Sequence, residues 1–147
     1  MSHELLEPAD ALRIILQHCA PTPAQDRDSE LALGCVLRQA VVSAAAVPPF
    51  DNSAMDGYAL SGGAAPLAAG SEWLVEGEQA AGDAMQGRAQ GAWEIMTGAA
   101  MPEGLDRVIP VEQTERLEAP HRVRLLAEVA PGQNVRLAGS DVAVGET

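Results

Sequence analysis

Residues 48–60, PPFDNSAMDGYAL, gather several side chains that could do chemistry. Within six residues the segment holds two carboxylates, an amide and a hydroxyl: Asp51, Asn52, Ser53 and Asp56. Gly57 follows directly. Such side chains also bond their own backbone in turns, where glycine accepts a positive φ. The residues alone therefore leave two interpretations open, a pair of turns or a functional site.

A calcium-binding loop does not fit this segment. That loop needs glycine at its sixth position and a bidentate glutamate at its twelfth. Counted from Asp51, the sixth residue is Asp56 and the twelfth is Gly62.

Two later segments hold further candidate residues. In IMTGAAMPEG, residues 95–104, a predicted strand runs into Thr97 and Gly98, and the N–H groups of such a turn can receive an anion. In GQNVRLAGSDVAVG, residues 132–145, Asn134, Arg136 and Asp141 could meet at one loop. Arg136 could clamp a phosphate or carboxylate, or it could cover the surface with its aliphatic stem. Both segments are also compatible with ordinary strand ends.

The composition excludes several kinds of chemistry. The chain has 147 residues, a net charge of -12 and nine basic residues, all of them arginine. Without lysine it has neither a phosphate-loop lysine nor a Schiff base. Its acidity disfavours nucleic acid and anionic membranes as partners. The three histidines share no metal-ligand spacing, and no Ser, His and Asp pattern indicates nucleophilic catalysis.

The two cysteines predict a reducing compartment. Cys19 and Cys35 are too far apart for a metal or redox pair, so we expect buried thiols that pack as small apolar groups. The sequence shows neither a secretory leader nor an apolar stretch long enough to span a bilayer. We therefore expect a cytoplasmic protein.

The N-terminal part predicts a helix. Pro8 suits the first helical position and Asp10 the positive first turn, and apolar residues recur at helical spacing until Pro21. After a linker, we expect a helical turn over residues 29–33 and a strand over residues 36–43.

The rest of the chain predicts a β-rich lobe. Short apolar segments alternate with breaks that contain glycine or proline, at residues 72–77, 93–98, 106–113, 121–129 and 142–146. Residues 61–70, SGGAAPLAAG, predict a mobile loop. The fold class is α+β and mainly β, an N-terminal helix followed by a barrel-like or sandwich-like lobe. The expected parts are 1–23, the helix; 24–45, the opening segment of a first domain; and 46–147, a β-rich second domain.

Taken in order, the three segments resemble the molybdopterin molybdenumtransferases, the molybdenum insertases that include the MoeA proteins and the E domain of gephyrin. The resemblance implies an enzyme that inserts molybdate into adenylylated molybdopterin and releases AMP, with Mg²⁺ assisting. It also implies a homodimer of four-domain subunits. The active cleft would then lie between the β-rich second domain of one subunit and the pterin-binding third domain of the other.

The same resemblance assigns site residues. Asp56, Thr97 and Asp141 would face the cleft as catalytic residues. The two carboxylates would hold Mg²⁺ directly or through its waters, and Thr97 with its turn N–H groups would steady an oxyanion. The expected substrate-binding residues are Asn52, Ser53, Gly98 and Arg136.

Some features depart from the family pattern. Ser140 stands where the family usually has an acidic residue, and Cys35 where it favours arginine. The third and fourth domains would lie after Thr147, so we expect this chain alone to be inactive. The alternative is a stand-alone, non-enzymatic module for dimerisation or partner docking. A reading frame that continues past Thr147 would favour the enzyme.

Overall fold

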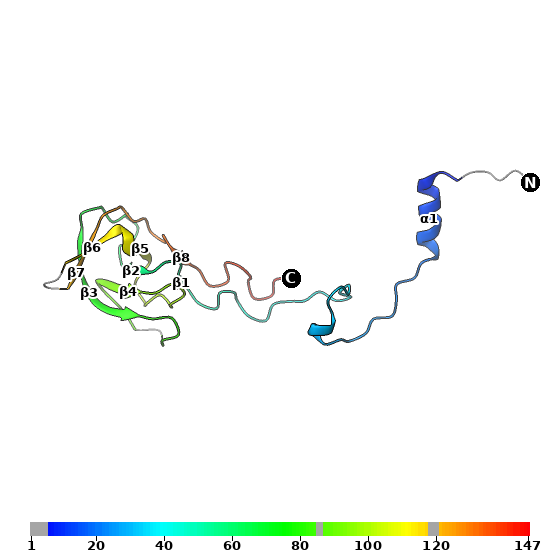
Figure 1. Cartoon of the computed structure of the whole chain (residues 1–147), viewed down its shortest axis with the longest axis horizontal. Coiled ribbons are helices and arrows are strands. Elements are labelled where there is room, and N and C mark those ends of the chain that lie inside the picture. The colour runs from blue at the N-terminus through cyan, green and yellow to red at the C-terminus, as the bar shows by residue number, and fades with distance from the viewer. Residues whose placement is uncertain (1–5, 85–86, 118–120) are drawn as a thin grey trace, which may run out of the picture. The chain divides into compact units, whose positions relative to one another are not determined.

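The computed structural model describes residues 6–84, 87–117 and 121–147, and the chain forms two compact units, Met1–Ala40 and Val41–Thr147 (Figure 1). In the first unit, helix α1 spans Pro8–His18 and the 3₁₀ turn η1 spans Ser29–Leu31. Both were expected. Proline starts α1 and Asp10 lies in its first turn. None of the residues in either element is buried.

The strand expected at residues 36–43 is absent, and that prediction is wrong. Val36, Val41 and Val42 are β-branched, but they are exposed and no described strand pairs with them. A strand needs a hydrogen-bonded neighbour, so β-propensity by itself did not produce one. The expectation of buried thiols is also wrong, because Cys19 and Cys35 are both exposed.

The second unit is a curled six-stranded sheet that forms a half-barrel, which confirms the mainly-β prediction (Figure 1). The strand order is β5-β2-β4-β3-β7-β6, and only the β3–β4 pair is parallel. A separate pair joins β1 to β8. The strands are β1 Asn52–Ser53, β2 Gly57–Leu60, β3 Glu72–Gln79, β4 Ala92–Ile95, β5 Arg107–Pro110, β6 Thr114–Leu117, β7 Arg122–Leu125 and β8 Val135–Arg136, and a 3₁₀ turn η2 covers Val111–Gln113.

Apolar residues pack on both faces of the sheet, and every residue of β2 and β5 is buried. Leu60 and Ala92 belong to one cluster, together with Val123 from β7. Ala59 and Ile95 belong to a second cluster on the opposite face. This alternation follows from the two-residue period of a strand.

A bulge in β3 interrupts that alternation. Val75 pairs with Ala92, but the next residue of β4, Trp93, pairs with Gly77, so Glu76 is an extra residue. Beyond an extra residue, the following side chains point to the opposite faces from those a regular strand would give them. Glu78 therefore lies opposite Glu94, on the same face of the sheet.

A buried arginine holds the segment expected to be a mobile loop, residues 61–70. Arg107 is fully buried, donates to the carbonyl of Ala65 at 2.8 Å and also bonds the carbonyl of Gly63. Its guanidinium pairs with Asp106 at 2.8 Å and, mainly through this hydrogen bonding, lowers the pKa of that carboxyl. Leu67 adds a backbone bridge to Val129. The segment is tied to the core, and a mobile loop is not supported.

The expected strands near residues 72–77, 93–98, 106–113 and 121–129 are present, whereas residues 142–146 contribute only a single bridge, between Val142 and Val47. Strands β1, β2, β6 and β8 were not predicted. Within the described ranges, we find no helix long and apolar enough to cross a membrane.

Candidate functional site

The segment at residues 48–60 forms two short strands joined by a tight turn. Ser53 ends β1, and its fully buried hydroxyl donates to the carbonyl of Met55 at 2.6 Å and accepts the Met55 N–H at 3.2 Å. This local pair of bonds fixes the turn that presents Asp56. Ser53 thus positions Asp56 through the turn and does not itself face the solvent.

Asp56 joins the first segment to the second. Its Oδ1 accepts the N–H of Thr97 at 2.7 Å and the Thr97 hydroxyl at 2.9 Å, although the two residues are 41 apart in the chain. Both residues are exposed. These bonds, the backbone one first, lower the pKa of Asp56. The carboxylate is therefore ionised at neutral pH, and its Oδ2 has no hydrogen-bond partner among the described residues.

Gly57 follows Asp56 for a different reason from the one expected. Its φ is not positive; instead, a Cβ at this position would lie 2.0 Å from the carbonyl oxygen of Ile109. Glycine is needed because β5 approaches β2 closely at this point. The expectation of a positive φ is wrong.

The turn after β4 is held against the first segment. Gly98, with a φ of 81°, donates its N–H to the carbonyl of Ser53 at 2.8 Å. The N–H of Ala99 is bonded to the carbonyl of Met96, and that of Thr97 to Asp56. All three N–H groups of the turn are thus engaged within the chain. This arrangement favours a role for Thr97 in orienting Asp56. It disfavours the expected role in binding an oxyanion.

The third segment also lies against the first. Arg136 of β8 pairs across the ladder with Asn52, which is 7% exposed and bonds the carbonyl of Phe50. Asp51 accepts the N–H of Ala138 at 2.7 Å. Arg136 is exposed and forms no ion pair with any residue that the structure describes. The fold thus brings all three predicted segments together.

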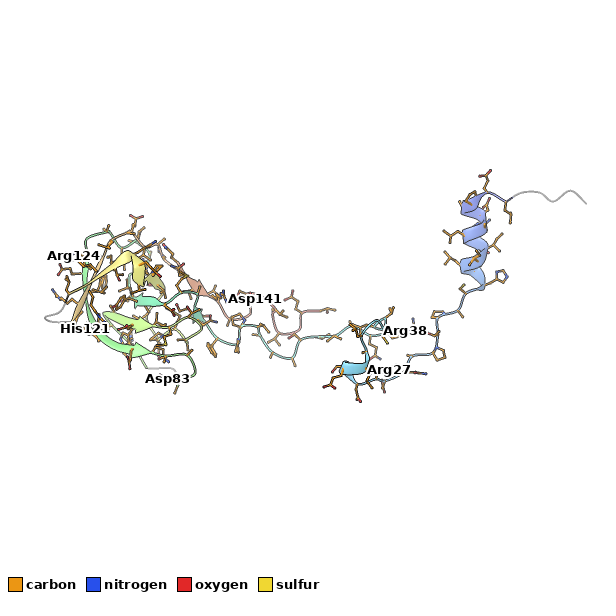
Figure 2. All side chains as sticks on the ribbon, viewed as in Figure 1. Arg27, Arg38, Asp83, His121, Arg124 and Asp141 are labelled. Carbon is orange, nitrogen blue, oxygen red and sulfur yellow. The ribbon has the colours of Figure 1, made fainter. Side chains whose placement is uncertain are left out.

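Asp141 is bonded to this assembly through its backbone only. Its N–H donates to the carbonyl of Val47 at 2.9 Å, and its exposed carboxylate lies 3.4 Å from the Ser140 hydroxyl (Figure 2). Its carboxylate makes no hydrogen bond to Asp56 or Thr97. Of the three predicted catalytic residues, the structure directly links two.

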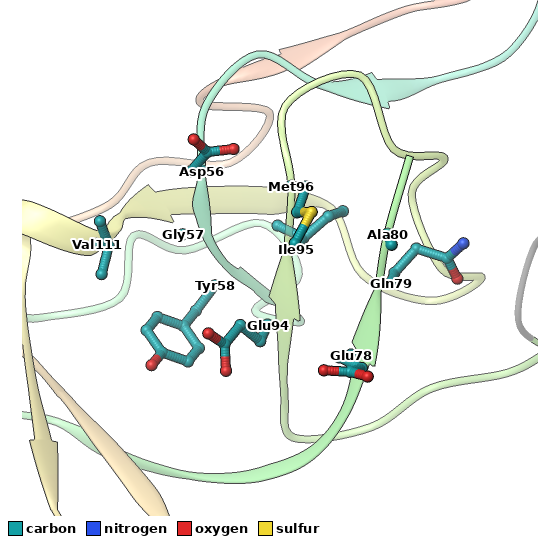
Figure 3. A pocket seen from close by; sticks show the side chains of 10 residues that line it. All are labelled: Asp56, Gly57, Tyr58, Glu78, Gln79, Ala80, Glu94, Ile95, Met96 and Val111. Atoms are coloured by element: carbon teal, nitrogen blue, oxygen red, sulfur yellow. The ribbon is translucent and has the colours of Figure 1, made fainter. Parts of the chain in front are cut away.

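A hollow of about 320 Å³ opens beside Asp56 (Figure 3). It lies where β2 begins and where β3 and β4 end, beside η2. No sequence motif marks several of its residues, because the register of the sheet brings them together. Its lining consists of Asp56, Gly57, Tyr58, Glu78, Gln79, Ala80, Glu94, Ile95, Met96 and Val111.

Charged side chains at one end of this hollow interact with Tyr58. Glu94 accepts from Arg116 at 2.7 Å, and Arg116 in turn donates to His121 at 3.2 Å. Burial, and next the charge of Glu94, raise the pKa of Tyr58, whereas Arg116 acts in the opposite direction. Tyr58 is 3% exposed and stays protonated at neutral pH.

The donor set allows only a simple metal site. The described part of the chain contains no group of three or more His, Cys, Asp or Glu side chains that could hold a metal ion. Mg²⁺ is often bound by one or two carboxylates and keeps several of its waters. The unbonded oxygen of Asp56 fits a hydrated Mg²⁺ ion, but the chain does not build a full cage for one.

The half-barrel and the three segments that it brings together are similar to solved structures of one class of protein. The molybdopterin biosynthesis moeA protein of Pyrococcus horikoshii OT3 matches with a TM-score of 0.70 and 35% identity over 80% of this chain and 32% of that one. A second structure of the same description has a TM-score of 0.68 and 26% identity, over 97% of this chain and 37% of that one. The class is that of molybdopterin biosynthesis proteins.

The chain belongs to the family described as the MoeA N-terminal region (domain I and II), whose model matches residues 6–147. Molybdopterin molybdenumtransferase 2 of Mycobacterium tuberculosis is 37% identical over 79% of this chain and 29% of its own length. Molybdopterin molybdenumtransferase of Haemophilus influenzae is 35% identical over 86% of this chain and 31% of its own length. The resemblance seen in the sequence is confirmed, and the chain spans about a third of these relatives.

Proposed function

We propose that this chain forms the N-terminal part of a molybdenum insertase, which transfers molybdate to adenylylated molybdopterin and releases AMP. Family membership and relatives named molybdopterin molybdenumtransferase support a place in molybdenum cofactor biosynthesis. The observation that carries the proposal is the pair of bonds from Thr97 to Asp56. These bonds hold an ionised carboxylate at the surface, beside a hollow.

In this proposal Asp56 is the working group of the chain. Thr97 fixes its Oδ1, so Oδ2 is aimed outward with little freedom to rotate. Asp56, with Asp141 as the second proposed ligand, would hold Mg²⁺, which when bound polarises the phosphoanhydride of the substrate. The lowered pKa of Asp56 keeps the carboxyl ionised to more acidic pH than usual, and the ionised form is the one that binds a cation.

The other predicted residues take supporting roles in the proposal. Ser53 and Gly98 brace the two turns through the bond from the Gly98 N–H to the Ser53 carbonyl. Asn52 and Arg136 pair across β1 and β8, and the exposed guanidinium of Arg136 suits an anionic group of the substrate. The remaining wall of the cleft, and a second subunit, would come from outside these 147 residues.

Cofactor formation in cells tests the proposal. In a strain that lacks the gene for this protein, we expect the natural gene to restore the molybdenum cofactor. Asp56→Asn keeps the size of the side chain but removes its charge, so we expect roughly 10²–10³-fold less cofactor formation, with adenylylated molybdopterin accumulating. Both are measured by chromatography of cell extracts.

The matched control is Glu103→Gln, which removes one negative charge from an exposed turn outside the hollow. It should restore the cofactor fully. Full restoration by Asp56→Asn would rule out the role proposed for this carboxylate.

A further inference from the structure

Asp51 is the other carboxylate of the first segment, and the proposed function gives it no role. Its side chain is exposed, but Oδ1 accepts the N–H of Ala138 at 2.7 Å, from 87 residues further along the chain. A hydrogen bond to an ionised carboxylate is stronger than one between neutral groups. Asp51 thus joins the first segment to the third, just as Asp56 joins the first to the second.

This bond lies where two antiparallel runs of unequal length face each other. Val47 pairs with Val142 at one end, and Asn52 pairs with Arg136 at the other. Between these points, one run consists of residues 48–51 and the other of residues 137–141, so the second run has an extra residue. An extra residue interrupts the backbone ladder between two strands.

The side chain of Asp51 compensates for that interruption. The longer run bends at Gly139, which has a φ of 72° and donates its N–H to the carbonyl of Pro48 at 2.9 Å. The N–H of Ala138, one residue earlier, is bonded to the carboxylate of Asp51 and not to a backbone carbonyl. The path of residues 137–141 therefore depends on an acceptor that only a side chain supplies.

The same run carries the carboxylate of Asp141, the second proposed ligand. That side chain has a single contact of 3.4 Å, with the hydroxyl of Ser140, the preceding residue. The backbone N–H of Asp141 is bonded to the carbonyl of Val47 at 2.9 Å. The position of the Asp141 carboxylate is thus set by its backbone, and so by the bonds that hold residues 137–141.

We propose that Asp51 is a positioning residue, which holds residues 137–141 through Ala138 and thereby places the carboxylate of Asp141. This inference rests on the proposed function, because the role of Asp141 belongs to it. The alternative role for Asp51 is that of a further metal ligand. The described residues hold no group of three His, Cys, Asp or Glu side chains that could bind a metal ion, which disfavours that alternative.

An amide at position 51 separates the two roles. Asp51→Asn keeps an oxygen that can accept the Ala138 N–H but loses the charge that a metal ligand needs. In the strain that lacks the gene, we expect this variant to form the cofactor within about threefold of the natural level. Asp51→Ala removes the acceptor, and we expect it to form about 10–100-fold less, because a small displacement of a working group is costly.

A matched control and a double substitution show whether the effect passes through Asp141. Asp83 is also exposed and also accepts a backbone N–H, from Ala80 at 3.4 Å, but it lies outside the three segments (Figure 2). Asp83→Ala should restore the cofactor fully. Adding Asp51→Ala to Asp141→Asn should lower cofactor formation by less than about twofold further, because the group to be positioned is already lost.

Hydrogen exchange in the 147-residue chain tests the contact without any turnover. By NMR, we expect the amide of Ala138 to exchange at least tenfold faster in Asp51→Ala than in the natural chain, because it loses its acceptor. In Asp51→Asn the exchange should stay close to the natural rate. The amides of β2 should be unchanged in both variants, which shows that the sheet remains folded.

The inference is overturned if Asp51→Asn loses as much cofactor as Asp51→Ala, if Asp51→Ala restores it fully, or if the losses of Asp51→Ala and Asp141→Asn multiply. Unchanged exchange of the Ala138 amide in Asp51→Ala would also overturn it. The exchange rates do not depend on any activity, and the proposed function fails on a different result, full restoration by Asp56→Asn. The two failures are therefore distinguishable.

Discussion

Replacing Gly57 by alanine should destabilise the half-barrel, because this position has no room for a Cβ. The added carbon would lie 2.0 Å from the carbonyl oxygen of Ile109, so the backbone of β2 or β5 must move by at least about 1 Å to reach even a tight 3.0 Å contact. No rotamer change relieves a clash between backbone and Cβ. Overpacking of this kind costs about 3 kcal/mol, which lowers the melting temperature of a domain of this size by about 10–20 °C.

Urea unfolding followed by tryptophan fluorescence measures this change, since Trp73 and Trp93 both lie in the sheet. The matched control is Gly87→Ala, at a glycine without positive φ and with open space around its Cβ. That variant should be neutral or up to about 1 kcal/mol more stable, because alanine restricts the unfolded chain. If Gly57→Ala were as stable as Gly87→Ala, the close approach of β5 would not explain the glycine after Asp56.

Two further predictions concern buried and exposed charges. Arg107→Met should lower the free energy of unfolding in urea by about 3 kcal/mol or more, because it leaves buried carbonyls without a donor. The control Arg88→Met replaces an exposed arginine and should stay within about 0.5 kcal/mol of the natural chain. Equal effects of the two substitutions would contradict the anchoring of residues 61–70. Thr97→Val should raise the pKa of Asp56 only partway to its ordinary value, since the stronger backbone donor remains, and Thr97→Ser should leave it low. Because folding lowers the pKa of Asp56, the stability that this group contributes is complete above the unfolded-state pKa and is lost as the pH falls through the folded-state pKa. NMR titration of the Asp56 carboxyl measures its pKa in both variants. An unchanged pKa in Thr97→Val would contradict the prediction.

Much of the candidate site could be predicted from the sequence because its residues sit in short, distinctive segments. Asp56 and Thr97 were paired by resemblance alone, and the structure joins them by two hydrogen bonds. The hollow could not be predicted in the same way. Glu78 and Glu94 are 16 residues apart, and only the register of β3 on β4 makes them neighbours.

The misassigned elements have a common physical origin. The residue pattern of 52–60 predicts no strand, yet β1 and β2 form there because partners distant in the chain supply their hydrogen bonds. Residues 36–43 show the reverse case, because they include strand-forming residues but pair with no described strand. Local propensity is a weak guide wherever pairing over long sequence distances decides the outcome.

The extra residue in β3 makes the distal half of that strand sensitive to length as well as to composition. Deleting Glu76 would restore strict alternation and leave Glu78 opposite Glu94, whereas regular pairing of the unshortened strand would turn the Glu78 side chain to the reverse side of the sheet. A family member without this extra residue would therefore keep the corresponding groups on the same faces although its strand is one residue shorter, and an alignment without a gap would match residues from opposite faces. In comparisons among relatives, the number of residues between Trp73 and Gln79 should therefore be established before individual residues are aligned.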